Sequence, residues 1–349
     1  MSVIKIPTES KKFFKSNLND IFKTGNLAEG FWNEKLSEFV SKTTNTKNSV
    51  PLCSNGAGLM SLFNYYNHYK NKKYILIQSN TMYGMYTMPI SSGLIVDQVI
   101  NCQINTLMPN FEDVKNAINK SNRKKDQIII MLSHMGGIIN PDIVKISSYC
   151  KKNKITLIED CAHSFGSTLN NKHSGTFGDA GVYSFYSTKA IPAGEGGIVV
   201  SENDKLLQFV KRFTIYDRFE QKMKIGVNIR LSEVQALLIY SVIKNYKHII
   251  LNKKKIAQKY IEVCKRYKIP FINQYENSQK GNYYKFVIFN KKQKINKFLP
   301  KLNTTTSKIY DYSLNSSKLI PDHHTCLPIW YKYETKNINK VISELKSNF

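Results

Sequence analysis

The sequence predicts an α/β protein, in which a three-layer α/β/α sandwich around a mainly parallel sheet is followed by a smaller C-terminal α+β domain. Between residues 50 and 200, short apolar runs of strand length alternate with segments of helical period, a pattern typical of parallel sheets. Beyond about Leu251 the pattern changes to a lysine-rich helix, a strand pair near 283–289 and a final helix. We therefore expect a large domain with an N-terminal arm over residues 1–250 and a small domain over residues 251–349.

The first predicted strand, over residues 50–53, runs directly into a turn of small residues at 54–58 and then into a helix. The free N–H groups and the dipole at the start of such a helix attract anions. We therefore expect a phosphate group to bind there, on the backbone N–H groups of Gly56 and Ala57.

The next strand that bears on function covers residues 128–132 and is followed by His134. This histidine is a candidate for substrate contact, although a hydrogen-bonded structural role is the favoured interpretation. Hydrophobic periodicity also predicts the remaining elements before residue 160, which are helices over 14–22, 32–40 and 143–149 and strands over 74–77 and 155–158.

Two predicted strands are each followed by a residue suited to catalysis. The run 155–158 ends abruptly in Glu159 and Asp160, and a second short strand over 181–185 leads to Lys189. Ligands bind at the carboxyl ends of strands in open α/β sheets. We therefore expect a carboxylate and an amine to lie in one cleft.

A carboxylate and a lysine in one cleft suit pyridoxal phosphate. The cofactor's aldehyde condenses with a lysine amine, and a neighbouring carboxylate keeps the pyridine nitrogen protonated so that the ring accepts electrons. Asp160 and Lys189 are the candidates for these roles. An isolated aspartate and lysine would more often be a strand end and a surface amine, so the surrounding motifs decide.

Four blocks surround this pair in order: Glu159–His163 (EDCAH), Gly175–Asp179 (GTFGD), Ser184–Lys189 (SFYSTK) and Gly194–Gly197 (GEGG). They resemble the DegT/StrS family of sugar aminotransferases, whose viosamine- and perosamine-forming members are the nearest pattern. The resemblance implies the aspartate-aminotransferase-like fold, fold type I.

The resemblance also implies a role for each matched residue. Asp160 pairs with the pyridine nitrogen, His163 lies beside the ring near its phenolic oxygen, Ser184 binds the phosphate and Lys189 holds the cofactor covalently. A branch of the family that removes a sugar hydroxyl has histidine in place of the lysine, so Lys189 indicates transamination.

Two positions near the cofactor depart from the family pattern. Ala57 stands where the family usually has threonine, which leaves backbone donors for the phosphate. Met82 stands where an aromatic residue usually stacks on the ring, so either Met82 or the neighbouring Tyr83 covers it.

A later block, Gly226–Ala236, resembles the family's GxNxRxxExQA. There Asn228 is implied to reach the phosphate of the neighbouring subunit's cofactor, which requires a homodimer. Arg230 either contacts the substrate or forms an ion pair. Ser232 and Gln235 predict a capping box at a helix start. The family's histidine-containing substrate loop has no clear match around 304–317.

The implied reaction moves an amino group from L-glutamate to a keto nucleotide sugar, by analogy C4 of a UDP- or dTDP-linked 4-keto-6-deoxyhexose. The alternatives are a C3 aminotransferase, a sugar dehydratase using the same cofactor, and a regulatory protein that kept the fold without turnover.

Composition limits other functions. The net charge of +26 raises the question of a nucleic-acid partner, but the lysines are spread along the chain without a basic helix or zinc finger, so we expect none. No apolar run approaches the roughly 20 residues that span a bilayer, and the start lacks a secretory signal. Six scattered cysteines without a CxxC pair indicate reduced thiols and no metal site. We expect a cytoplasmic protein.

Overall fold

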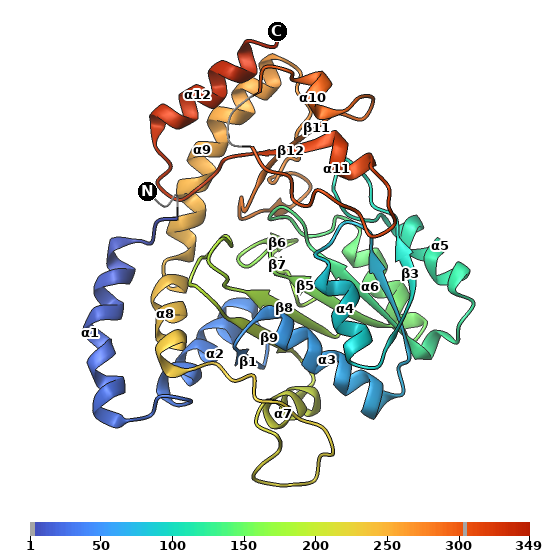
Figure 1. The fold of residues 1–349 in the computed structure, drawn as a ribbon, viewed down its shortest axis with the longest axis vertical. Coiled ribbons are helices and arrows are strands. Elements are labelled where there is room, and N and C mark those ends of the chain that lie inside the picture. Colours follow the sequence, from blue (N-terminus) through green and yellow to red (C-terminus); the bar gives the residue numbers. More distant parts are fainter. Residues whose placement is uncertain (1–3, 303–305) are drawn as a thin grey trace.

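The computed structural model describes residues 4–302 and 306–349 of the chain. Its centre is a seven-stranded sheet in the order β1-β9-β8-β5-β4-β2-β3 (Figure 1). The run from β8 to β3 is parallel throughout, whereas β9 pairs antiparallel with both β8 and β1. The predicted mainly parallel sheet is confirmed. Its strands are β1 (Asn48–Leu52), β2 (Tyr74–Gln78), β3 (Ile95–Ile100), β4 (Ile128–Ser133), β5 (Thr156–Cys161), β8 (Ala180–Ser184) and β9 (Gly197–Ser201).

Helices cover both faces of this sheet because its strands are apolar on both sides. On β8, for example, Val182 packs in one hydrophobic core and Tyr183 in another, as the alternation of side chains along a strand requires. One face is covered by α3 (Asn55–Lys70), α4 (Gly84–Ser91) and α7 (Asp204–Phe213), and the other by α1 (Thr8–Thr24), α2 (Phe31–Thr44), α5 (Phe111–Ser121), α6 (Ile143–Lys152) and α8 (Glu233–Ile243).

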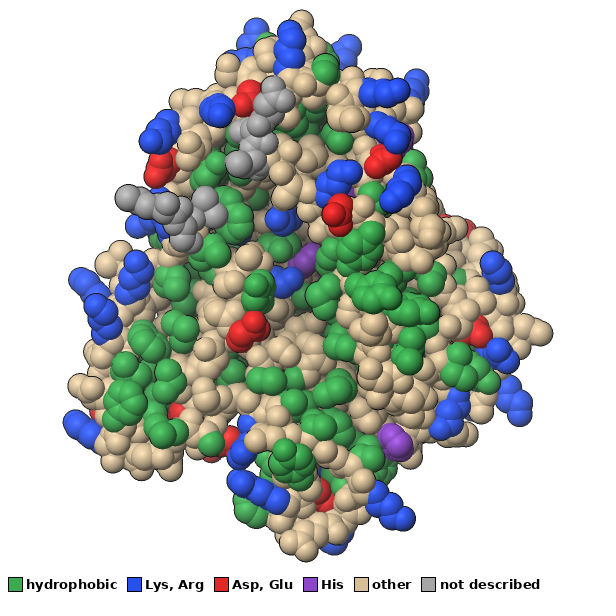
Figure 2. All heavy atoms as spheres, viewed as in Figure 1, with side chains coloured by type: hydrophobic (Ala, Val, Ile, Leu, Met, Phe, Trp, Pro, Cys, Tyr) green, Lys and Arg blue, Asp and Glu red, His purple; other side chains and the backbone are tan. Residues whose placement is uncertain are grey.

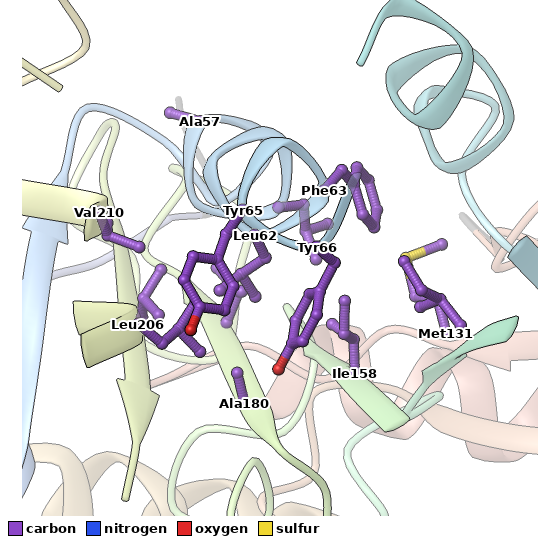
Figure 3. Close-up of a cluster of buried hydrophobic side chains, with 14 of the residues drawn as sticks. Ala57, Leu62, Phe63, Tyr65, Tyr66, Met131, Ile158, Ala180, Leu206 and Val210 are labelled. Atoms are coloured by element: carbon purple, nitrogen blue, oxygen red, sulfur yellow. The ribbon is translucent and has the colours of Figure 1, made fainter. Parts of the chain in front are cut away.

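The packing of α3 illustrates how the sheet holds its helices. Figure 3 shows Tyr66 of this helix directed at the sheet, toward Ile158 and Ala180. Gly58 of the same helix lies so close to β8 that a Cβ there would come within 2.6 Å of Val182 Cγ1. Burial of each such large side chain contributes about 1.5–3 kcal/mol. The start of α3 is thereby held against the carboxyl end of the sheet.

The C-terminal part packs around a separate hydrophobic core, made of residues between Ile256 and Leu345. The long helix α9 (Tyr246–Arg266) crosses the expected boundary after residue 250 without interruption. Only one strand forms near 283–289, and its antiparallel partner comes from farther along the chain, so the predicted local pair is wrong. This part contains β11 (Phe286–Phe289), β12 (His324–Leu327), α10 (Ile295–Phe298), α11 (Leu319–His323) and α12 (Thr335–Lys346).

Short elements join the two parts. The strands β6 (Thr168–Leu169), β7 (Lys172–His173) and β10 (Gln279–Lys280) form a small sheet in which β10, from the C-terminal part, pairs with β6. A 3-10 turn, η1 (Lys125–Gln127), precedes β4.

The predicted capping box at α8 is half present. Ser232 Oγ accepts the N–H of Gln235, as expected of an N-cap. The Gln235 side chain does not return to the helix start; instead its Nε2 donates to the backbone carbonyls of Ala193 and Glu195. It therefore fixes the glycine-rich turn that follows Lys189.

Several helices were not expected, among them α4, α5 and α7. The segment after residue 200 contains α7, which Asn203 caps by accepting the N–H of Leu206 at 3.2 Å. Within the described residues, no helix has the length and apolar character needed to cross a membrane, and the six cysteines are free thiols.

Candidate active site

Asp160 lies at the carboxyl end of β5, beside β8, where it is 5% exposed. Its Oδ1 accepts Asn55 Nδ2 at 3.2 Å and the N–H of Ala162 at 3.1 Å, and its Oδ2 accepts Ser133 Oγ at 2.9 Å. Ser133 Oγ is in turn 2.9 Å from Thr81 Oγ1. Donors from separate segments therefore hold the carboxylate in one orientation.

Lys189 follows β8 in a turn, where its N–H donates to the carbonyl of Tyr186 at 2.9 Å. Its Nζ lies 5.5 Å from the centroid of the Tyr284 ring. Burial lowers the pKa of Lys189 below its usual value and the charge of Lys285 lowers it further, while Asp160 opposes them. The amine therefore gives up its proton more readily than a surface lysine, as a catalytic base near neutral pH requires.

His163 completes this cluster. Its side chain is 4% exposed, and its ring centroid lies 4.4 Å from that of Tyr284. Burial lowers the pKa of His163 well below its usual value, and the charges of Lys189 and Lys285 lower it further. Its Nδ1 is buried and has no hydrogen-bond partner among the described residues. Because buried polar atoms are normally paired, this neutral imidazole is suited to a bound polar group.

The cluster lies below the C-terminal part of the molecule. Figure 2 shows this face hollowed near its middle, with blue lysine or arginine and purple histidine side chains inside the depression. Tyr284, Lys285 and Tyr310 all come from the C-terminal part and line the cluster from above. Burial raises the pKa of Tyr310 well above its usual value, and the negative charge of Asp160 adds to this effect.

The segment that carries Tyr284 and Lys285 is tied to the large domain by hydrogen bonds. Asn282 Nδ2 donates to the carbonyls of His163 and Phe165, both at 2.9 Å, and the N–H of Asn282 donates to Gly137 at 3.0 Å. The N–H of Lys285 donates to Gly136 at 3.0 Å. Gly137 has a φ of +107° and contacts Asn282 so closely that a Cβ would collide with it. We call residues 282–285 the tethered segment.

The helix start at which we expect a phosphate to bind is the first turn of α3. Ser54 Oγ accepts the N–H of Ala57 at 3.1 Å, so that donor is engaged in capping the helix. A Cβ on Gly56 would lie 3.1 Å from Met88 Sδ, which explains why glycine fits there. Ser184 is 8% exposed at the end of β8, and its Oγ accepts the N–H of Tyr186 at 3.4 Å. Phosphate binding by these residues stays a prediction.

Met82 and Tyr83 lie in the turn before α4, 43% and 57% exposed. The N–H of Tyr83 donates to Tyr312 Oη at 2.6 Å, and its ring centroid is 5.9 Å from that of Tyr86. Which of the two residues covers the cofactor ring stays open.

Asn228 and Arg230 lie on the segment before α8. Their side-chain hydrogen bonds and ion pair are with each other and with Glu29, and not with Asp160, His163 or Lys189. Asn228 is exposed, and its Oδ1 accepts Arg230 Nε at 3.1 Å. Arg230 Nη1 lies 3.4 Å from Glu29 Oε2. The ion pair that was the alternative for Arg230 is therefore present, and contact of Asn228 with a second subunit stays a prediction.

His134 is completely buried, which supports the favoured interpretation, a hydrogen-bonded structural role, over contact with the substrate. Its Nε2 lies 2.8 Å from Glu159 Oε2, and its Nδ1 accepts the N–H of Asn140 at 3.1 Å. Both ring nitrogens are thus engaged. His134, Glu159 and Cys161 lie within 4.8 Å of one another, but the Glu159 carboxylate already accepts N–H groups from Gly175, Phe177 and Gly178.

The aromatic and lysine residues that the C-terminal part contributes to the site were not predicted from the sequence. A signal was present in the run Tyr283–Lys285 directly before an apolar strand. Tyr310 and Tyr312 come from the region where no family histidine was found, of which residues 303–305 lie outside the described part. The site is therefore lined there by tyrosines.

Comparisons with known proteins agree with this arrangement. The model of the DegT/DnrJ/EryC1/StrS aminotransferase family matches residues 8–346. The GDP-perosamine synthase of Vibrio cholerae is 32% identical over 159 residues, 44% of this chain and 42% of that protein. The UDP-4-amino-4,6-dideoxy-N-acetyl-beta-L-altrosamine transaminase of Helicobacter pylori is 26% identical over 270 residues, 74% of this chain and 67% of that protein. The match to the Vibrio protein thus spans less than half of its length.

Solved structures share the fold. A DegT DnrJ EryC1 StrS aminotransferase from Brucella abortus superposes with a TM-score of 0.86 at 16% identity, covering 99% of each chain. The predicted fold class is thereby confirmed.

Proposed function

The chain belongs to the DegT/DnrJ/EryC1/StrS aminotransferase family, and we propose that it moves an amino group from L-glutamate to a keto nucleotide sugar. Pyridoxal 5'-phosphate is the cofactor of this family, consistent with a solved relative in complex with a ketimine intermediate. The observation that carries the proposal is the buried cluster of Lys189, Asp160 and His163 at neighbouring strand ends.

The residues present fit the cofactor. The buried and unpaired His163 Nδ1 offers a polar partner beside the Lys189 amine. The oriented Asp160 would face the pyridine nitrogen, and the start of α3 with Ser184 would hold the phosphate. When bound, pyridoxal phosphate supplies an aldehyde that exchanges amino groups and a ring that stabilises negative charge on the adjacent carbon.

The chain's own residues supply proton transfer and orientation. Lys189 would hold the resting cofactor, and its free amine would take the proton from the donor's Cα. Its lowered pKa suits this role. In the second half the same amine returns a proton to the carbon of the sugar that receives the nitrogen. The net reaction converts L-glutamate and a ketone into 2-oxoglutarate and an amine.

The acceptor we favour is C4 of UDP- or dTDP-4-keto-6-deoxyglucose, which gives a 4-amino-4,6-dideoxyhexose. The Helicobacter relative carries a 4-amino-4,6-dideoxy sugar linked to UDP in its name, which supports this choice, and the name of the Vibrio relative adds GDP to the nucleotides that need testing. A net charge of +26 suits a substrate with a diphosphate. The alternative acceptor is C3 of a 3-keto sugar.

We also propose a cytoplasmic homodimer, in which the exposed Asn228 reaches the cofactor phosphate of the other subunit. An Asn228→Ala variant that folds normally but binds pyridoxal phosphate more weakly than the wild type would support such shared sites. Analytical ultracentrifugation of the wild type checks the dimer directly, and a monomer at micromolar concentration would contradict it.

One spectrum tests the central proposal. The protein reconstituted with pyridoxal phosphate should show visible absorbance that shifts when L-glutamate is added, and Lys189→Ala should lose that response. With 3- and 4-keto sugars on UDP, dTDP and GDP, mass spectrometry should detect an aminated nucleotide sugar and 2-oxoglutarate.

A dehydratase would release no 2-oxoglutarate, and a regulatory protein would bind the cofactor without exchanging amino groups. No product with any of these sugars would refute the proposal.

A further inference from the structure

Tyr284, in the tethered segment, connects two of the three residues that carry the proposed function. Its side chain is 8% exposed, and its ring centroid lies 4.4 Å from that of His163, with an angle of 37° between the two rings. The Nζ of Lys189 lies 5.5 Å from the same ring centroid, within the range in which an aromatic ring attracts an ammonium group. One ring of the C-terminal part therefore lies against both the imidazole and the reacting amine.

The backbone of Tyr284 is joined to that of His163 through one amide side chain. The N–H of Tyr284 donates to Asn282 Oδ1 at 2.8 Å, and Asn282 Nδ2 donates to the carbonyl of His163 at 2.9 Å. Asn282 is completely buried, so these hydrogen bonds are costly to leave unmade. A Cβ on Gly137 would also lie 2.8 Å from the Tyr284 nitrogen. The ring therefore has a fixed place relative to His163.

The residue before Tyr284 has a strained backbone. Tyr283 has a φ of +50°, in the left-handed region that aromatic residues rarely adopt. Such a conformation costs about 1–3 kcal/mol and persists only where the surroundings enforce it. Here Gln274 Oε1 accepts the N–H of Tyr283 at 2.8 Å. Strain of this kind is concentrated at functional sites, and at this position it precedes the side chain that lies against the cluster.

We propose that Tyr284 is a positioning residue, which holds the His163 imidazole and the Lys189 amine in the relative geometry that the reaction requires. The inference rests on the proposed function. A displacement of about 1 Å in a reacting group can lower a rate by about 100-fold. Loss of a ring that restrains both groups should therefore affect the rate of proton transfer by Lys189 more than the binding of the amino donor.

Three variants test this role. Tyr284→Leu removes the ring, and Tyr284→Phe keeps the ring without its hydroxyl. Tyr283→Leu is the matched control, because the buried Tyr283 ring stacks on Tyr275, with centroids 5.6 Å apart. In the glutamate half-reaction, we expect Tyr284→Leu to lower the maximal rate roughly 10- to 100-fold, with the KM for L-glutamate within about twofold of wild type. The other two variants should stay within about threefold of the wild-type rate.

Histidine NMR of the cofactor-free protein tests the contact without turnover. The seven histidines are isotopically labelled, and His163→Gln identifies the signal of His163. Its ring protons should show a nuclear Overhauser effect to the Tyr284 ring and a shift caused by the current of that ring. Both signs of contact should disappear in Tyr284→Leu and persist in Tyr284→Phe and Tyr283→Leu.

The outcomes separate this inference from the proposed function. A wild type that gives no response to L-glutamate contradicts the proposed function and the inference with it. If the wild type does transfer amino groups, a Tyr284→Leu rate equal to that of the Tyr283→Leu control, or a loss that lies in KM alone, overturns the positioning role and leaves the proposed function intact. If Tyr284→Leu does not fold, the wild-type spectrum decides: the contact with His163 supports the role, and its absence overturns it.

Discussion

Replacement of Lys253 by methionine should make the protein more stable, because it removes a buried lysine whose amine has no hydrogen bond or ion pair among residues 4–302 and 306–349. A pKa of about 7 in the folded chain, against 10.5 for an ordinary lysine, corresponds to a penalty of about 4 kcal/mol at pH 7. The methylene groups of methionine fill most of the same volume. For a chain of 349 residues, this gain would raise the melting temperature by about 5 °C.

The stability gained by Lys253→Met should depend on pH. Because the folded pKa of Lys253 is lowered, the folded state binds fewer protons than the unfolded state between about pH 7 and 10.5. Stability from this group therefore rises with pH across that window. The advantage of the variant should be fully present at pH 7 and should shrink below about 1 kcal/mol at pH 10.

Thermal unfolding of the cofactor-free protein at pH 7 and pH 10, followed by tryptophan fluorescence, measures both effects. Lys255→Met serves as the control for loss of one positive charge from a very basic protein. A variant less stable than wild type at pH 7, or a gain that is the same at both pH values, would refute the reasoning.

Three further predictions concern the site and its support. Asp160→Asn should fold normally but lower the rate of amino transfer by at least about 100-fold, measured by 2-oxoglutarate release at saturating substrate. Lys285→Met should raise the pKa of Lys189 by removal of a like charge, so the acid limb of the pH profile of the glutamate half-reaction should move to higher pH. Glu233→Ala should lower the free energy of unfolding by about 2–4 kcal/mol, seen in urea titration, because the buried Glu233 carboxylate accepts N–H groups at the start of α2 at 2.8 and 2.9 Å.

The positions of Asp160 and Lys189 were predictable because both follow an apolar run of strand length, and because parallel strands end at the same edge of a sheet. Asp160 and Lys189 follow two apolar runs, and adjacent parallel strands place such ends at one edge of a sheet. The burial of His134 was not predictable with the same certainty, because it depends on a hydrogen bond to Glu159, 25 residues away.

The contribution of the C-terminal part to the site was not predictable from local patterns, although the run Tyr283–Lys285 precedes an apolar strand. Tyr284 and Lys285 are about a hundred residues from Lys189, and only the tertiary fold brings them to the same cluster. The second half of the predicted capping box at α8 is absent for a related reason. Its Gln235 side chain has a better partner in the turn after Lys189 than in its own helix, and local pattern rules do not include such competitors.

The tethered segment has a consequence for how ligands enter. Hydrogen bonds from Asn282 and Lys285 hold the tethered segment against loops of the large domain. A hinge motion that moved this segment away from the large domain would break all of these hydrogen bonds together, so we expect the segment to stay in place during turnover. Opening of the site on this side would therefore cost the loss of these hydrogen bonds, about 1 kcal/mol for each.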